Sequence, residues 1–169
     1  MNLKEHIRGI SDFPIPGILF YDISTIMQSN EAMEYVIDSL HDQIKDWKPD
    51  IIAGIESRGF LFATPLALKM GLPMMMIRKA GKLPGEVVSY EYDLEYGTDT
   101  IQIQFDAIQA GQKVVIIDDL LATGGTLEAS IKLCQKVGGA VVGCAVVIEL
   151  DFLNGRNNLS APCKSLVHY

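Results

Sequence analysis

The sequence predicts a single-domain α/β protein whose central sheet is mostly parallel and flanked by helices. Two short apolar runs, residues 51–55 and 114–117, show no polar alternation, which is typical of strands buried on both faces. Each run is followed by a turn of small residues and then by apolar residues at helical spacing. Strand, turn, helix, strand is the order that builds a parallel sheet with right-handed crossovers. The length of 169 residues fits one domain, expected to span 1–169.

The remaining strands and helices are predicted from the spacing of apolar residues and from the Gly and Pro residues that end helices. Two further strands are expected from apolar runs, over residues 74–77 and 140–149. Three helices are expected, each with apolar residues at helical spacing and with Gly or Pro near its end: 30–45, 60–70 and 127–137.

Residues 78–103 have a different pattern from the rest of the chain. They combine three cations with Pro84-Gly85 and several tyrosines, and residues 100–103 alternate as an antiparallel strand does. We therefore expect a long mobile loop or a hairpin here. Long loops inside compact domains often serve as lids over a functional site.

The composition indicates which partners the protein binds and where in the cell it is found. Lys and Arg total 14 against 21 for Asp and Glu, so the net charge is −7 and general binding to a nucleic acid backbone is not expected. The three cysteines form no CxxC pair and are expected to be reduced thiols. With no apolar run typical of a signal peptide or a membrane span, we expect a soluble cytoplasmic protein without membrane partners.

The segment from residue 114 to Thr126 carries the most specific chemical signal. A buried strand leads to two adjacent carboxylates, Asp118 and Asp119, and then to a Thr-Gly-Gly-Thr turn that opens a helix. Glycines let backbone N–H groups converge, threonines add hydroxyl donors and the helix N-terminus adds partial positive charge, so the turn is suited to binding a phosphate. The glycine spacing matches neither a Walker A loop nor GxGxxG.

The two carboxylates indicate what else the site would bind. They would repel a phosphate, so we expect them to accept hydrogen bonds from another group of the ligand, such as the hydroxyls of a ribose. A nearby Mg²⁺ would moderate the repulsion between carboxylates and phosphate. Such an ion would be held mainly by substrate oxygens, because Mg²⁺ prefers to keep waters and phosphate ligands. A metal site made of protein side chains is not expected, because the three histidines are scattered and lack ligand spacing. A triad hydrolase is disfavoured by the lack of a GxSxG motif.

Four segments together carry a resemblance to a known family. They are the acidic pair with its Thr-Gly-Gly-Thr loop, then 12–23, 54–60 and 77–85, the last running on to Leu-Glu-Tyr-Gly at 94–97. In order and spacing, the chain resembles the type I phosphoribosyltransferases over nearly its whole length, and within them the group that uses adenine. The resemblance implies that family's fold, with an N-terminal hood over about residues 1–30 and a flexible lid loop over about 78–103. It also implies a Mg²⁺-dependent transfer of ribose 5-phosphate from phosphoribosyl pyrophosphate to adenine, giving AMP and pyrophosphate in purine salvage.

The resemblance also implies catalytic roles. Asp118 and Asp119 would hold the ribose hydroxyls beside a transition state with oxocarbenium character, where negative charge is favourable. Glu95 would be the general acid or base that exchanges a proton with the purine. The 5-phosphate would lie in the loop formed by Ala122, Thr123, Gly124, Gly125 and Thr126.

The remaining implied roles concern pyrophosphate and the base. Pyrophosphate would meet the loop of Glu56, Ser57 and Arg58, with a non-proline cis peptide between the first two. It would also meet the cations Arg78, Lys79 and Lys82, with Arg78 acting in part across the interface of a homodimer.

Adenine would lie in the hood, stacked on Phe20 and paired with backbone around Leu19 and Tyr21. Many members of the family have Arg where this chain has Tyr21.

Two alternatives keep the same binding pocket. The chain could be a regulatory module that senses phosphoribosyl pyrophosphate without reacting, although such modules usually add a DNA-binding domain, for which 169 residues leave no room. It could also be an enzyme for 6-oxopurines, although the family members for those bases lack this hood and the Leu-Glu-Tyr-Gly loop.

Overall fold

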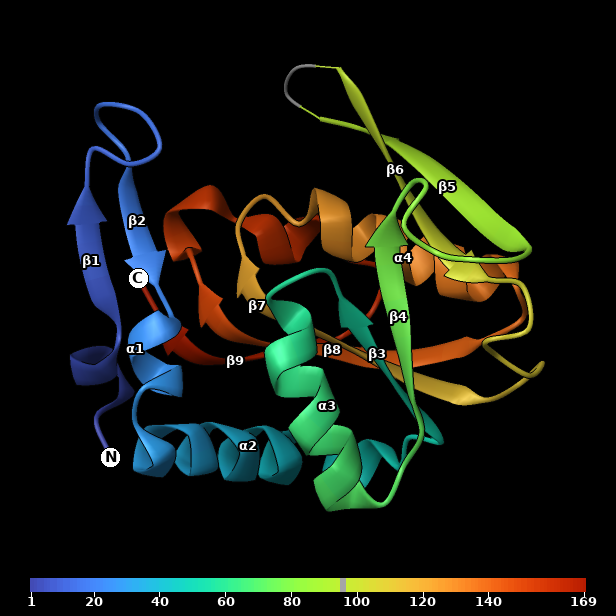
Figure 1. Cartoon of the computed structure of the whole chain (residues 1–169), viewed down its shortest axis with the longest axis horizontal. Coiled ribbons are helices and arrows are strands. Elements are labelled where there is room, and N and C mark those ends of the chain that lie inside the picture. The colour runs from blue at the N-terminus through green and yellow to red at the C-terminus, as the bar shows by residue number, and fades with distance from the viewer. Residues whose placement is uncertain (95–96) are drawn as a thin grey trace.

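The computed structural model describes residues 1–94 and 97–169, and it is an α/β fold built on one seven-stranded sheet (Figure 1). The strand order is β5-β6-β4-β3-β7-β8-β9, with parallel pairing from β4 through β9 and an antiparallel β5/β6 hairpin at the other edge. The strands are β3 (Ile51–Ile55), β4 (Met74–Lys79), β5 (Val87–Asp93), β6 (Thr98–Gln104), β7 (Lys113–Leu121), β8 (Ala140–Glu149) and β9 (Cys163–His168). The predicted α/β class with a mostly parallel sheet is therefore confirmed.

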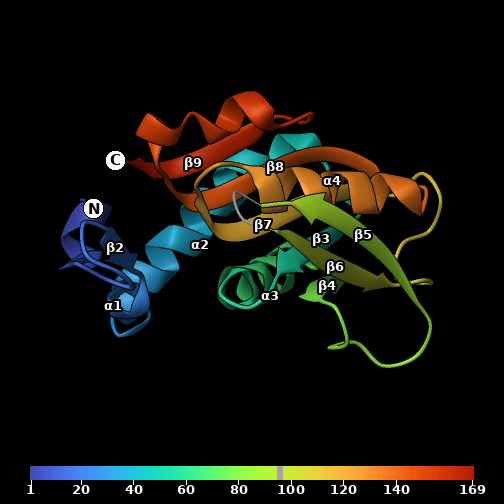
Figure 2. The ribbon, with the colours of Figure 1, turned by 90° about the horizontal axis from the view of Figure 1, so that it is seen from above.

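Helices cover both faces of this sheet, as the view from above makes plain (Figure 2). Helices α2 (Asn30–Ile44) and α3 (Gly59–Met70) lie on one face, and α4 (Gly125–Lys136) lies on the other. Neighbouring residues of one strand serve opposite faces, since Ile52 packs in the cluster with α2 and α3 while Ile51 packs in the cluster with α4. This double burial explains the uninterrupted apolar runs of the sequence.

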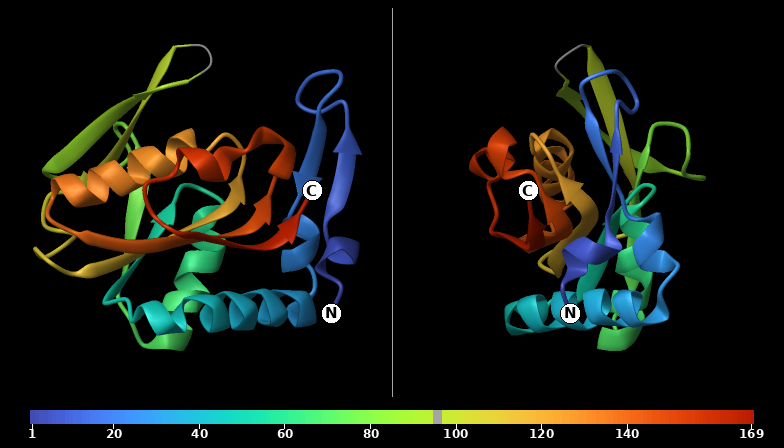
Figure 3. Two further views of the ribbon diagram at one scale, coloured as in Figure 1. Left: turned by 180° about the vertical axis from the view of Figure 1, so that it is seen from behind. Right: turned by 90° about the vertical axis from the view of Figure 1, so that its left-hand side faces the viewer.

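Two hairpins stand at opposite ends of the sheet. One is β1 (Arg8–Ser11) with β2 (Leu19–Asp22), followed by α1 (Ser24–Met27), and it lies beside β9 and the C-terminus (Figure 3). The other is β5 with β6. Both project on the side where the parallel strands have their carboxyl ends (Figures 1 and 3). The two hairpins thus stand on either side of the edge at which α/β proteins bind ligands.

Most predicted boundaries agree with the structure to within two residues. The first helix begins after Ser29, whose Oγ accepts the N–H of Ala32 at 3.2 Å. The second ends at Gly71, whose φ of +66° is a conformation that glycine adopts readily. Residues 78–103 contain the antiparallel hairpin, which was one of the two predicted forms.

Two boundaries of the 114–126 segment were wrong. The strand does not stop at Ile117: it continues through Leu121, because β7 keeps its pairing with β8 as far as Leu121 opposite Glu149. The helix begins at Gly125 rather than at residue 127, with the Glu128 N–H donating to the Gly124 carbonyl at 2.9 Å. The acidic pair therefore belongs to the strand itself.

Strands β1, β2 and β9 and the short helices of the C-terminal segment were not predicted. Cys134, Cys144 and Cys163 are buried and unpaired, as expected of free thiols. None of the helices in residues 1–94 and 97–169 is long and apolar enough to cross a membrane.

Candidate functional site

A cavity of about 340 Å³ lies at the carboxyl ends of β3, β4 and β7. Its walls come from the turn after β3, the end of β4, the acidic pair of β7 and one side of the β5/β6 hairpin. A smaller cavity of about 100 Å³ adjoins it within the loop from Leu121 to Leu127, and Asp118, Leu120 and Thr126 line both cavities. Sequence segments that are more than 50 residues apart therefore meet at one site, as the predicted phosphate loop and acidic pair require.

The two adjacent carboxylates line the larger cavity, and the first is hydrogen-bonded to the backbone of the second. Asp118 is half-buried and its Oδ1 accepts the backbone N–H of Asp119 at 2.9 Å. Asp119 is only 5% exposed, and its Oδ2 has no hydrogen-bond partner within the described part of the chain. Burial, and then the charge of Asp119, raise the pKa of Asp118 well above its usual range. Burial also raises the pKa of Asp119, against the opposing charge of Arg58.

Arg58 connects the acidic pair to the N-terminal hairpin. Its Nε lies 3.0 Å from Oδ2 of Asp119, without the angle of a hydrogen bond. Its guanidinium carbon lies 5.3 Å from the centre of the Phe20 ring, within cation–π range. The side chain is 42% exposed and lines the larger cavity, so it is available to an anionic ligand.

The other predicted cations of the cavity already have acidic partners. Glu56 Oε2 accepts both the Nε of Arg78 and the backbone N–H of Lys79, each at 2.9 Å. Lys79 Nζ lies 3.1 Å from Asp99, and this hydrogen bond raises the pKa of Lys79. Glu56 therefore orients the end of β4, while the ammonium of Lys79 remains exposed at the cavity rim.

The Thr-Gly-Gly-Thr loop lies between β7 and α4. Gly124 has a φ of +87°, a left-handed conformation that lets the chain turn from the strand into the helix. The hydroxyl of Thr126 lies 3.1 Å from the hydroxyl of Tyr92 on β5, so the loop also contacts the hairpin.

The structure brings together most of the predicted binding residues, with differences in detail. Ser57, Arg58, Asp118, Asp119 and the loop from residue 122 to 126 surround the two cavities. The cis peptide expected at Glu56–Ser57 is present. Lys82 is exposed and lies outside the lining of the larger cavity. Glu95 lies outside the described residues.

The three predicted base-binding residues lie on β2, beside the site. Phe20 reaches it through its contact with Arg58. Tyr21 instead packs on the C-terminal Tyr169, with ring centres 4.0 Å apart. Leu19 is 48% exposed.

Sequence reasoning missed three residues at the site. Asp99 pairs with Lys79, Tyr92 contacts Thr126, and Asn158 donates to the Thr123 carbonyl at 2.8 Å. The first two lie in the segment where alternation was visible only over residues 100–103. Asn158 carried no signal, because its contact depends on how the chain folds back after β8.

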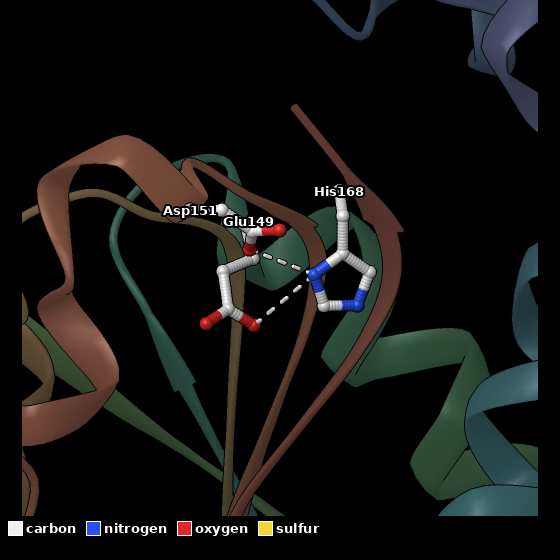
Figure 4. A group of neighbouring side chains, drawn as sticks. All are labelled: Glu149, Asp151 and His168. Carbon is white, nitrogen blue, oxygen red and sulfur yellow. Dashed lines mark hydrogen bonds and ion pairs between the residues drawn. The ribbon is translucent and has the colours of Figure 1, made fainter.

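One cluster of the described residues has the composition of a metal site, away from these cavities. Glu149, Asp151 and His168 lie at the ends of β8 and β9 with ligand atoms within 4.8 Å of one another (Figure 4). The Arg156 guanidinium, however, pairs with both carboxylate oxygens of Glu149. A cation would have to displace this charge, so the cluster is better suited to structural ion pairing than to a metal.

Comparisons with known proteins agree with this geometry. A family model described as the phosphoribosyl transferase domain matches residues 22–167. The fold and site thus define a phosphoribosyltransferase. A relative from Acidiphilium cryptum, named adenine phosphoribosyltransferase, is 57% identical over 100% of this chain and 99% of its own length. The chain therefore belongs to the adenine phosphoribosyltransferase family.

Solved structures support the same assignment. Adenine phosphoribosyltransferase from Thermoanaerobacter pseudethanolicus superposes with a TM-score of 0.96 at 48% identity, covering 99% of this chain and 98% of that one. The enzyme from Saccharomyces cerevisiae, in complex with adenine and an imino-altritol bisphosphate, gives a TM-score of 0.92 at 42% identity, covering 97% and 96%. The Trypanosoma brucei enzyme, in complex with AMP, pyrophosphate and ribose-5-phosphate, is 28% identical with a TM-score of 0.89, covering 98% and 78%.

Proposed function

We propose that this chain makes AMP and pyrophosphate from adenine and phosphoribosyl pyrophosphate, with Mg²⁺, as a step of purine salvage. The observation that carries the proposal is the continuity of the two cavities. One holds a glycine-rich loop at a helix N-terminus and the other a cationic loop, and Asp118 of the acidic pair lines both. This order matches the order of groups in the substrate, which has a phosphate, a ribose and then a pyrophosphate.

The ribose would lie against the acidic pair. Oδ2 of Asp119 is a buried acceptor without a hydrogen bond among the described residues, and a ribose hydroxyl would supply the missing donor. Carboxylates beside the anomeric carbon also favour a transition state in which that carbon gains positive charge. Asp118 and Asp119 would thus bind the substrate and stabilise the transition state.

The leaving pyrophosphate would meet the turn after β3 and the end of β4. Arg58 and Lys79 line the cavity there and would neutralise its charge, together with the backbone of Glu56 and Ser57. Arg78, which is held by Glu56, would contribute less directly from within this chain. Lys82 would reach the substrate only through movement of its loop, consistent with the lid proposed for residues 78–103.

The chemistry requires one bond to form and one to break. N9 of adenine bonds to the anomeric carbon, the bond from that carbon to pyrophosphate oxygen breaks, and its electron pair leaves with pyrophosphate. The proton lost by the purine would go to the carboxylate of Glu95. Phe20 would stack on the purine, and the backbone of Leu19 and Tyr21 would pair with its edge.

The donor set of the site is compatible with Mg²⁺. Asp118 and Asp119 would provide the hard oxygen ligands that this ion prefers, and Oδ2 of Asp119, which has no hydrogen bond among the described residues, would accept a metal-bound water as readily as a hydroxyl. When bound, mainly through substrate oxygens, the ion would neutralise charge on the pyrophosphate group. Arg58 would share that task from the protein side.

A homodimer and a cytoplasmic location stay predictions. The homodimer is tested by sedimentation equilibrium of the intact chain at micromolar concentration, where a single species of twice the chain mass is expected. A monomer with full activity would show that no partner residue is needed.

The reaction itself is tested by incubating the chain with phosphoribosyl pyrophosphate, adenine and Mg²⁺ and following AMP and pyrophosphate by chromatography. We expect both products in equal amounts, and none when EDTA is in excess over the metal. Tight binding of phosphoribosyl pyrophosphate without any product would favour the sensor alternative instead.

A further inference from the structure

The chain after β8 returns to the outer side of the Thr-Gly-Gly-Thr loop. It forms two short 3₁₀ helices, η3 (Asp151–Leu153) and η4 (Gly155–Asn158). Gly155 is buried so closely against the loop that a Cβ atom there would lie 2.0 Å from the carbonyl oxygen of Ala122. A Cβ on Gly124 would in turn lie 2.5 Å from the Gly155 carbonyl oxygen. The two backbones are therefore in direct contact.

Hydrogen bonds fix this contact at two points. Nδ2 of Asn158 donates to the carbonyl oxygen of Thr123 at 2.8 Å. Two residues further on, the N–H and Oγ of Ser160 both donate to Oε2 of Glu128, at 2.8 and 3.0 Å. Glu128 belongs to the first turn of α4, so the returning chain is attached both to the loop and to the helix that follows it.

An ion pair holds η4 itself in place. Nε of Arg156 donates to Oε1 of Glu149 at 3.0 Å, and the same guanidinium also contacts Oε2 and the Cys163 carbonyl. Glu149 is 5% exposed and ends β8, beside β9 (Figure 4). Removing one partner would leave the buried charge of Glu149 poorly compensated, so this pair anchors η4 to the end of β8.

The contacts also determine which way the loop presents its donors. In a planar trans peptide the N–H points opposite to the C=O. The carbonyls of Ala122 and Thr123 both face η4, so the N–H groups of Thr123 and Gly124 face away from it. Neighbouring N–H groups that point to the same side of a turn can together bind an anion.

We propose that η4 positions the backbone donors for the 5-phosphate, with Asn158 as the positioning residue and the Arg156–Glu149 pair as its anchor. The inference rests on the proposed function only in taking this loop as the 5-phosphate site. Asn158 touches no substrate in this account, and it acts through the Thr123 carbonyl alone.

The test compares Asn158→Ala with Asn157→Ala, its exposed neighbour on the same short helix. Binding of ribose 5-phosphate and of pyrophosphate is measured separately by calorimetry on each full-length variant. We expect Asn158→Ala to weaken ribose 5-phosphate binding about tenfold, because a misaligned Thr123–Gly124 peptide would lose one backbone hydrogen bond to the charged phosphate, and to leave pyrophosphate binding unchanged. The Asn157→Ala variant should bind both ligands as the unmodified chain does.

Asn158→Asp makes the test stricter. The new side chain has the same shape but, when ionised, only accepts hydrogen bonds, so it would repel the Thr123 carbonyl. It should weaken ribose 5-phosphate at least as much as Asn158→Ala. Unchanged binding in both variants, or an equal loss of ribose 5-phosphate and pyrophosphate, would overturn the inference. Failure of the unmodified chain to form AMP would count against the proposed function alone, because this comparison needs only binding.

Discussion

The Nε of Arg58 lies 3.0 Å from Oδ2 of Asp119, so the cation of the turn after β3 meets the acidic pair of β7. The same guanidinium lies 5.3 Å from the ring of Phe20. One flexible side chain thus contacts the residues proposed for the ribose and for the base, while lining the cavity proposed for pyrophosphate. The three parts of the proposed site are therefore coupled through Arg58.

Arg58→Gln should weaken phosphoribosyl pyrophosphate by about tenfold or more, because it removes a charged donor from the proposed pyrophosphate site. The KM for this substrate, measured at saturating adenine, checks the expectation. Arg8→Gln is a suitable control, since Arg8 is an exposed cation that pairs with Asp22 in the N-terminal hairpin. If the KM is the same in both variants, the role of Arg58 is wrong.

The double change Asp118→Asn with Asp119→Asn should lower kcat by about 100-fold or more, since it removes the charge proposed to stabilise the transition state. Asp106→Asn, at an exposed position, serves as the matched control. Full activity in the double variant would contradict the proposed role of the pair.

The same double variant should be more stable than the unmodified chain at pH 8. The folded-state pKa of both carboxyls is raised, so on going up in pH the unfolded chain loses these protons before the folded chain does. Stability is therefore lost as pH rises from about 4, the usual carboxyl pKa, through the raised values. Thermal melting is measured for both proteins at pH 4 and pH 8. The melting temperature of the variant should exceed that of the unmodified chain by more at pH 8 than at pH 4, by about 2–4 °C for each kcal/mol of burial cost removed. A difference in melting temperature that is smaller at pH 8 than at pH 4 would contradict the direction of the pKa shifts.

Gly59→Ala should reduce activity through a displacement of the acidic pair. A Cβ atom at this first residue of α3 would lie 2.8 Å from the Ile117 carbonyl oxygen and 3.0 Å from Oδ1 of Asp118. We expect kcat/KM for phosphoribosyl pyrophosphate to fall by about tenfold, as small misplacements at reacting groups cost at least this much. Thr64→Ala, on an exposed position of the same helix, should keep normal kinetics. Normal kinetics in Gly59→Ala too would mean that this contact is not needed.

Glu95→Ala should lower kcat more than it raises the KM for either substrate, because a proton-transfer group acts mainly in the transition state, with an effect of about 100-fold or more. Steady-state kinetics at varied adenine provides the measurement, and Glu91→Ala, an exposed glutamate of β5, provides the control. A variant that retains kcat would remove Glu95 from the mechanism.

The sequence was most informative where local pattern and burial coincide. The apolar runs of β3 and β8 predicted both strands with their observed bounds, because strands buried on both faces need apolar residues throughout. The 114–126 segment predicted the acidic pair and the loop, but pairing with β8 carried the strand four residues further, to Leu121. Hydrogen bonding between strands, which no local pattern encodes, decided that boundary.

The contacts made by the C-terminal segment were invisible in the sequence. Strand β9 pairs with β8 because the chain turns back after β8 and adds a strand to the edge of the sheet. Gly155 contacts Ala122, which lies 33 positions earlier in the sequence. Likewise the partners of the predicted cations, Glu56 for Arg78 and Asp99 for Lys79, depend on strands brought together by the sheet. The residue types predicted that the site would bind an anion. Tertiary contacts determined which of the predicted cations already have an acidic partner.

The choice of base tests most directly whether this chain transfers ribose 5-phosphate to adenine. The intact chain is incubated with phosphoribosyl pyrophosphate, Mg²⁺ and, in separate reactions, adenine, hypoxanthine, guanine or xanthine, and nucleotide and pyrophosphate are measured by chromatography. We expect AMP and pyrophosphate from adenine and no nucleotide from the other three bases. Nucleotide from a 6-oxopurine, with none from adenine, would contradict this expectation.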